Sequence, residues 1–86
     1  MKILEAFAAR LPVVSTAIGA EGLDVESGRH LLIADDPPSI AACAVELLHD
    51  DSKCRQMTDE AHKLVSERYD WRIIRADLAQ RLRALI

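Results

Sequence analysis

The feature that most constrains the fold is a pair of short apolar runs separated by a glycine-containing loop. Residues 13–16 are rich in β-branched side chains, and residues 30–34 form an apolar run between turn residues. Runs of this length and composition are typical of buried strands. All three glycines of the chain lie between them, which indicates a loop with left-handed backbone positions. We expect the second strand to run parallel to the first.

Helical periodicity flanks this strand pair. Residues 2–10 place apolar side chains at helical spacing, and Pro12 ends that helix because the residue before a proline avoids the α conformation. Prolines after Asp36 predict a second helix start, and Asp51 or Ser52 and then Asp70 predict two more. The expected apolar stripes of these three helices are Ile40, Ala44, Leu47 and Leu48, then Cys54, Met57, Ala61, Leu64 and Val65, then Trp71, Ile74, Leu78, Leu82 and Leu85.

Together these elements predict an α/β fold, a partial Rossmann-like arrangement of two parallel strands and about four helices. We expect one unit over residues 1–86, with helix, strand, loop and strand in residues 1–36 and three helices in residues 37–86. A parallel pair that is buried on both faces needs more sheet beside it. The sequence therefore predicts the end of a larger domain.

Composition excludes several classes of protein. The 14 acidic residues outnumber the 11 basic ones, so the chain lacks the dense positive surface that tracks nucleic acid. No run approaches the roughly 18 apolar residues that span a membrane. Two cysteines are too few for a disulfide framework, which favours a reducing, cytoplasmic setting. Eighty-six residues cannot enclose a deep active site, which counts against a complete enzyme.

Glu5 is the first candidate functional residue, because it lies in the first turns of the first helix and off its apolar stripe. Two interpretations remain open from the residues alone. A carboxylate near a helix N-terminus stabilises the helix dipole. An ionised carboxylate can also accept two hydrogen bonds from the adjacent hydroxyls of a ribose, as acidic residues do in the nucleotide sites of open α/β sheets.

The remaining chemically active residues form no clear constellation. Gly19 and Glu21 follow the carboxyl end of the first strand, where open α/β sheets bind ligands, although an ordinary turn also explains them. The three histidines and two cysteines lack paired-ligand spacing, so we expect no metal site and a surface or capping role for the histidines. The arginines of the last helix are interleaved with acidic residues and indicate a solvated face.

Several segments together resemble one family. They are residues 2–9 (KILEAFAA), 11–16 (LPVVST), 19–23 (GAEGL) and 28–37 (GRHLLIADDP), with the sequence YDW at 69–71 before the last helix. In combination they resemble the group 1 glycosyltransferases, which are retaining nucleotide-sugar enzymes of the GT-B architecture. The resemblance implies the C-terminal fragment of a donor-nucleotide-binding domain. The parent would transfer a sugar, such as a hexose, from a UDP- or GDP-linked donor to an acceptor, without a cofactor or metal.

The resemblance also assigns roles to individual residues. In that family two glutamates seven residues apart flank a loop at the donor site, and Glu5 matches the second of them. Glu5 would therefore accept hydrogen bonds from the ribose hydroxyls of the bound nucleotide sugar. Gly19 and Glu21 fall in a loop that lies near the donor pocket in relatives, which is a looser match. Arg10 departs from the pattern, because relatives usually carry the glycine that suits a left-handed helix end.

The catalytic residues and most of the donor site would then lie upstream of Met1, in segments that include the N-terminal acceptor domain. Transfer needs groups that stabilise the departing diphosphate, so we expect the isolated chain not to catalyse measurably. An exposed strand edge and an uncovered apolar stripe predict a homo-oligomer. The expected location is the cytoplasm, including the inner face of the membrane. The alternative function is a small helical protein–protein interaction module that binds no sugar nucleotide.

Overall fold

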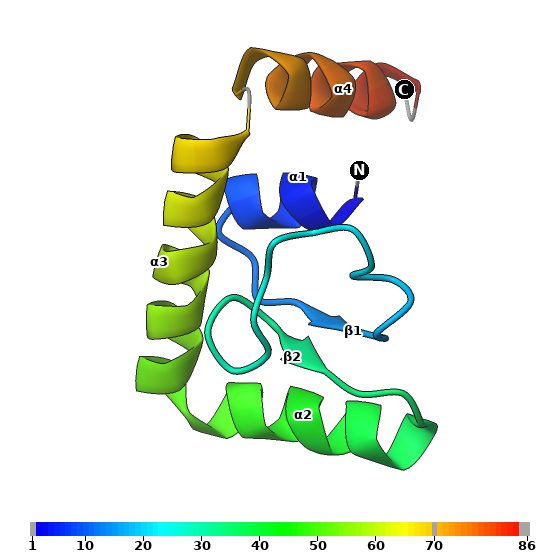
Figure 1. Ribbon diagram of the computed structural model, residues 1–86, viewed down its shortest axis with the longest axis vertical. Coiled ribbons are helices and arrows are strands. Elements are labelled where there is room, and N and C mark those ends of the chain that lie inside the picture. Colours follow the sequence, from blue (N-terminus) through cyan, green and yellow to red (C-terminus); the bar gives the residue numbers. More distant parts are fainter. Residues whose placement is uncertain (1, 70, 85–86) are drawn as a thin grey trace.

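Four helices surround a two-stranded parallel sheet in a computed structural model that describes residues 2–69 and 71–84 (Figure 1). The predicted α/β class and the predicted number of elements are confirmed. Two predicted features, the cap at Asp70 and the stripe position Leu85, lie outside the described residues. In chain order the elements are α1 (Lys2–Ala8), β1 (Val14–Ser15), β2 (Leu32–Ile33), α2 (Pro37–His49), α3 (Asp51–Arg68) and α4 (Trp71–Ala84).

The strands pair in parallel, as predicted, with Val14 opposite Leu32 and Ser15 opposite Ile33. Each strand is only two residues long, shorter than the apolar run that predicted it. A turn precedes β2 and is closed by the Gly28 amide, which donates to the Leu31 carbonyl at 2.7 Å. This turn limits β2 on its N-terminal side, since the backbone of residues 28–31 bonds within the turn.

Both faces of the sheet are covered, α1 lying over one and α2 over the other in Figure 1. Alternate residues of the second strand run point to opposite faces, as the period of two requires. Leu31 packs into a core cluster with Phe7 of α1, whereas Leu32 packs with Leu47 of α2 and Met57 of α3. Two small cores therefore lie on either side of the sheet, and α3 contributes to both.

The end of α1 has the hydrogen-bond pattern of a Schellman motif. The Leu11 amide donates to the Ala6 carbonyl at 2.9 Å, and the Arg10 amide donates to the Phe7 carbonyl at 3.1 Å. Arg10 takes up the left-handed position of this motif, with a φ of 59°. This position favours glycine, because a Cβ crowds the backbone there. The helix therefore ends in the left-handed conformation that suits the glycine of relatives, with Arg10 in the strained position.

The caps of α2 and α3 are both aspartates. Asp36 caps α2, its side chain accepting from the Ser39 amide at 3.0 Å, as the prolines after it predict. The predicted cap of α3 at Asp51 or Ser52 is wrong by one or two residues, because Asp50 accepts from the Lys53 amide at 2.9 Å. Asp50 serves both helices, since its own amide donates to the last turn of α2.

The apolar stripe predicted for α3 is buried over most of its length, but the other two stripes are covered only in part. On α2, Leu47 is buried, whereas Ala44 is exposed and Leu48 is 83% exposed. On α4, Ile74 is buried and Leu82 is 53% exposed. The predictions for Ala44 and Leu48 are wrong because α2 packs on the sheet and α3 through Cys43 and Leu47, which turns these residues outward.

Candidate functional site

One aspartate joins the carboxyl ends of the two strands through a hydrogen bond. Asp35, just after β2, accepts through Oδ1 from the Ala17 amide, just after β1, at 2.9 Å. Thr16 stabilises the turn that follows, its Oγ1 accepting from the Gly19 amide at 3.0 Å. This is the end of a parallel sheet at which ligands bind in open α/β folds. The structure therefore holds the loop of Gly19 and Glu21 at the edge where a donor site is expected.

Within that loop, glycine is required locally. A Cβ on Gly19 would lie 2.7 Å from Ser15 Oγ, closer than such atoms approach, and Gly22 has a φ of +85°. Glu21 is exposed, and its amide donates to the Ile18 carbonyl at 3.1 Å. The turn interpretation of Gly19 thus has a physical basis, and it is compatible with a position beside a ligand.

Glu5 is more buried than its position off the apolar stripe of the first helix suggests. It lies in the first turn of α1 and is only 9% exposed, although it falls off the apolar stripe of that helix. Helix α4 runs alongside α1 in Figure 1 and is in contact with it. Arg81 of α4 brings its Nε to 3.0 Å from Glu5 Oε1, close enough for an ion pair but without hydrogen-bond alignment. Arg81, from the far end of the chain, is therefore a charge partner of Glu5.

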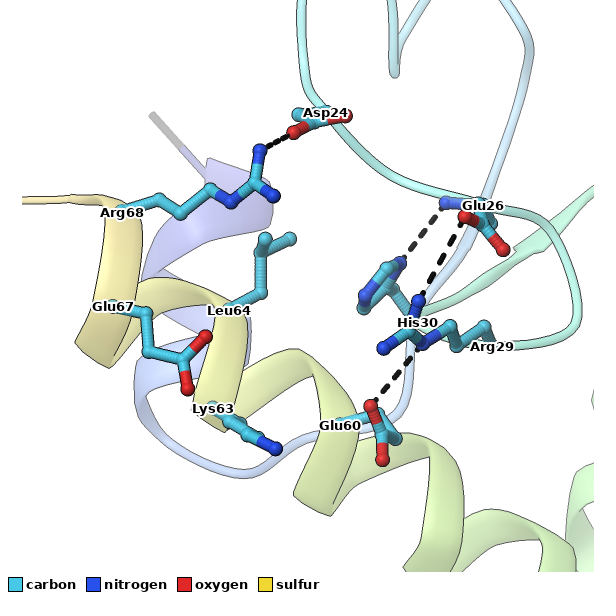
Figure 2. Close-up of a pocket in the computed structure, with 9 residues that line it drawn as sticks. All are labelled: Asp24, Glu26, Arg29, His30, Glu60, Lys63, Leu64, Glu67 and Arg68. Carbon is cyan, nitrogen blue, oxygen red and sulfur yellow. Dashed lines mark hydrogen bonds and ion pairs between the residues drawn. The ribbon is translucent and has the colours of Figure 1, made fainter.

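A second polar region lies on the other side of the molecule, between α3 and the loop of residues 23–30. A cavity of about 120 Å³ lies there, and neither Glu5, Gly19 nor Glu21 lines it (Figure 2). Ion pairs join its two walls, since Arg68 of α3 pairs with Asp24 and Glu60 of α3 pairs with Arg29. The residues around the cavity are Asp24, Glu26, Arg29, His30, Glu60, Lys63, Leu64, Glu67 and Arg68.

His30 stabilises the loop that forms one wall of that cavity. Its ring is 6% exposed, and Nδ1 accepts from the Glu26 amide at 3.0 Å (Figure 2). Burial lowers the pKa of His30 and the Arg29 charge lowers it further, while the charges of Glu26 and Glu60 act in the opposite direction. His30 thus bonds the backbone of a loop and is buried, whereas His49 is exposed, so the surface or capping role expected for the histidines differs from one to another.

Neither region has the features of a metal centre. Among residues 2–69 and 71–84, no group of three or more histidine, cysteine, aspartate or glutamate side chains is arranged to hold an ion. Both cysteines are free and half-buried. In the same described part of the chain, every helix is too short or too polar to cross a bilayer.

A family model described as "Glycosyl transferases group 1" matches residues 1–50. The matched segment contains α1, both strands and α2, and so includes Glu5 and the loop of Gly19 and Glu21. Residues 69–71, which also carry the resemblance, lie beyond its end. No curated protein and no solved structure matches the chain. The matched segment is more than half of the 86 residues, and the chain therefore belongs to the group 1 glycosyl transferases.

Proposed function

We propose that the chain is the C-terminal part of the donor-nucleotide-binding domain of a retaining GT-B glycosyltransferase, which transfers a sugar from a UDP- or GDP-linked donor. The observation that carries the proposal is the family match across Glu5 and both strands. The fold supports it, because α1 begins at the end of the molecule toward which the strands point (Figure 1). Glu5 is then a first-turn carboxylate at the ligand-binding end of a parallel sheet.

In this proposal Glu5 accepts hydrogen bonds from the ribose hydroxyls of the donor. A carboxylate suits the task because it only accepts, and the two hydroxyls only need an acceptor on that side. Its burial strengthens the interaction, since a charged hydrogen bond gains energy where water is excluded. Such bonds contribute about 1.5–3 kcal/mol each. Gly19 and Glu21 form the neighbouring loop and contact the donor less directly.

The isolated chain is proposed to bind the donor weakly and not to transfer its sugar. Departure of the nucleoside diphosphate places charge on the phosphate oxygens, which basic groups must stabilise. These groups, the catalytic residues and the acceptor site are assigned to an N-terminal partner domain. The parent works in the cytoplasm or at the inner membrane face. The parallel strand pair and the family match favour this function over a helical interaction module.

The experiment that tests this function compares ribose with deoxyribose. We expect NMR titration of the chain to detect weak binding of UDP or GDP and weaker binding of the matching 2′-deoxynucleotide. In Glu5→Gln the affinity for the ribonucleotide should fall about tenfold, and the discrimination should disappear, because a neutral amide accepts more weakly than a carboxylate. Glu67→Gln is the matched control, since it removes a carboxylate from exposed α3 surface. Equal ribose discrimination in Glu5→Gln and in the unaltered chain would exclude this role.

We also propose that the chain alone forms a homo-oligomer. Val45 and Leu48 lie one turn apart on the exposed side of α2 and are 52% and 83% exposed. Uncovered apolar side chains beside a two-stranded sheet favour association. Light scattering should give at least twice the mass of one chain at micromolar concentration. A monomer that persists at every concentration tested would contradict the proposal.

A further inference from the structure

Helix α4 covers the residue that the proposed function needs to be accessible. Glu5 belongs to α1, yet its carboxylate faces Arg81 of α4, with 3.0 Å between Oε1 and Nε. The Glu5 side chain is 11% exposed, whereas that of Arg81 is 46% exposed. A ligand that donates hydrogen bonds to this carboxylate must therefore enter the space that Arg81 holds.

We propose that α4 is an autoinhibitory latch, with Arg81 taking the place of the ribose hydroxyls on Glu5. This inference rests on the proposed function, because it assumes that Glu5 receives the nucleotide. The guanidinium and the hydroxyls are alternative partners, because both are donors and a hydroxyl that donates to Oε1 competes there with Arg81. Donor binding and the docked position of α4 exclude each other.

The packing of α4 shows where the latch opens. Ile74, in the first half of the helix, is 8% exposed and belongs to the core cluster that includes Phe7 and Val65. In the second half, Leu82 is 53% exposed and Arg83 is also exposed. The first half is thus held by apolar burial, while the half that carries Arg81 is held more weakly. Displacement of the second half frees Glu5 without disrupting the core.

The position of the ion pair determines how strongly the latch acts. Arg81 is nearly half exposed, so solvent screens the interaction and Arg81 remains replaceable. Because the Glu5 side chain is only 11% exposed, a donor group that replaces Arg81 offsets the cost of losing this ion pair. The ribose hydroxyls supply that group. Binding of the nucleotide and release of the helix are therefore coupled.

The test measures UDP and GDP affinity by NMR titration of the full chain and its variants. Arg81→Ala should raise the affinity about 3- to 5-fold, the range expected for the loss of a solvent-screened ion pair that competes with the ligand. Arg83→Ala is the matched control, because it removes an exposed arginine from the same last turn. Its affinity should stay within about twofold of the unaltered chain. The double variant Glu5→Gln/Arg81→Ala should show no gain.

A second measurement follows the helix itself, without any nucleotide. Hydrogen exchange should become faster in the second half of α4 in Arg81→Ala, and saturating UDP should produce the same change in the unaltered chain. If Arg81→Ala leaves affinity unchanged while Glu5→Gln still abolishes ribose discrimination, the latch is wrong and the proposed function stands. If no variant, including Arg81→Ala, discriminates ribose from deoxyribose, the proposed function fails and the latch is refuted with it.

Discussion

Replacing Arg10 by glycine should relieve backbone strain and give a more stable protein than Arg10→Ala, although both substitutions remove an ion pair. Arg10 has a φ of 59° at the left-handed position that closes α1. Its side chain also pairs with Asp59 of α3, with 2.7 Å between Nη1 and Oδ1, and both side chains are more than half exposed. The substitution therefore separates two contributions of opposite sign: relief of backbone strain and loss of a surface ion pair.

The backbone contribution can be estimated by comparing Arg10→Gly with Arg10→Ala, because both lack the ion pair. A residue with a Cβ costs about 1–2 kcal/mol in the left-handed conformation. Glycine in turn loses about 0.4–1 kcal/mol more backbone entropy on folding than alanine does. The difference leaves Arg10→Gly about 0.5–1 kcal/mol more stable than Arg10→Ala. The exposed ion pair contributes up to about 1 kcal/mol, so the two contributions nearly cancel and Arg10→Gly should lie within about 1 kcal/mol of the unaltered chain.

Urea unfolding followed by far-ultraviolet circular dichroism measures this difference at one fixed protein concentration. With a urea dependence of about 1 kcal/mol per molar for a small domain, the midpoint of Arg10→Gly should lie about 0.5–1 M above that of Arg10→Ala. Asp59→Asn reports the ion pair alone, since it leaves the backbone at Arg10 unchanged. Equal midpoints for the glycine and alanine variants would refute the reasoning, because they would mean that the native chain is not strained at this position.

Two further predictions concern the loop before β2. Gly28 has a φ of +91° and open space where a Cβ would lie, so Gly28→Ala should destabilise the fold by about 0.5–1 kcal/mol through the backbone alone, as a lower urea midpoint. His30 is neutral when buried, and its pKa lies below the usual value of 6.5, so the unfolded chain binds its proton first as the pH falls. The contribution of His30 to the free energy of unfolding is complete above pH 6.5 and is lost as the pH falls through the lower folded pKa. The urea midpoints at pH 7.5 and 5.5 should therefore differ less in His30→Gln than in the unaltered chain.

The parallel strand pair could be predicted because its signals are local. Val13 and Val14 are β-branched next to a helix-ending proline, and the run around Leu31 is apolar without helical length. Burial of Leu31 and Leu32 on opposite faces follows from strand geometry alone once the sheet is covered on both sides. The lengths of the strands are harder to predict, because a strand ends where its backbone amides form hydrogen bonds within a turn and not with the neighbouring strand.

Helical periodicity alone does not predict that Leu48 points outward. Leu47 and Leu48 are neighbours on α2, so a stripe that includes one is only about 100° of helix rotation from a stripe that includes the other. Which of them is buried depends on how α2 packs on the sheet and on Met57 of α3. The sequence pattern gives the width of the apolar face but not the direction of its centre.

Glu5 shows the same limit where it bears on function. Its position in the first turn of α1 supports either a dipole interaction or a ribose contact, and both depend only on local sequence. The structure adds a third partner, Arg81, which reaches Glu5 because α4 packs beside α1. The three interactions differ in whether burial away from water strengthens them. A dipole interaction needs no burial, whereas a ligand contact and an ion pair both gain from the burial that Glu5 has. The burial therefore argues against the dipole as the sole reason for this carboxylate, and Arg81→Ala distinguishes the other two.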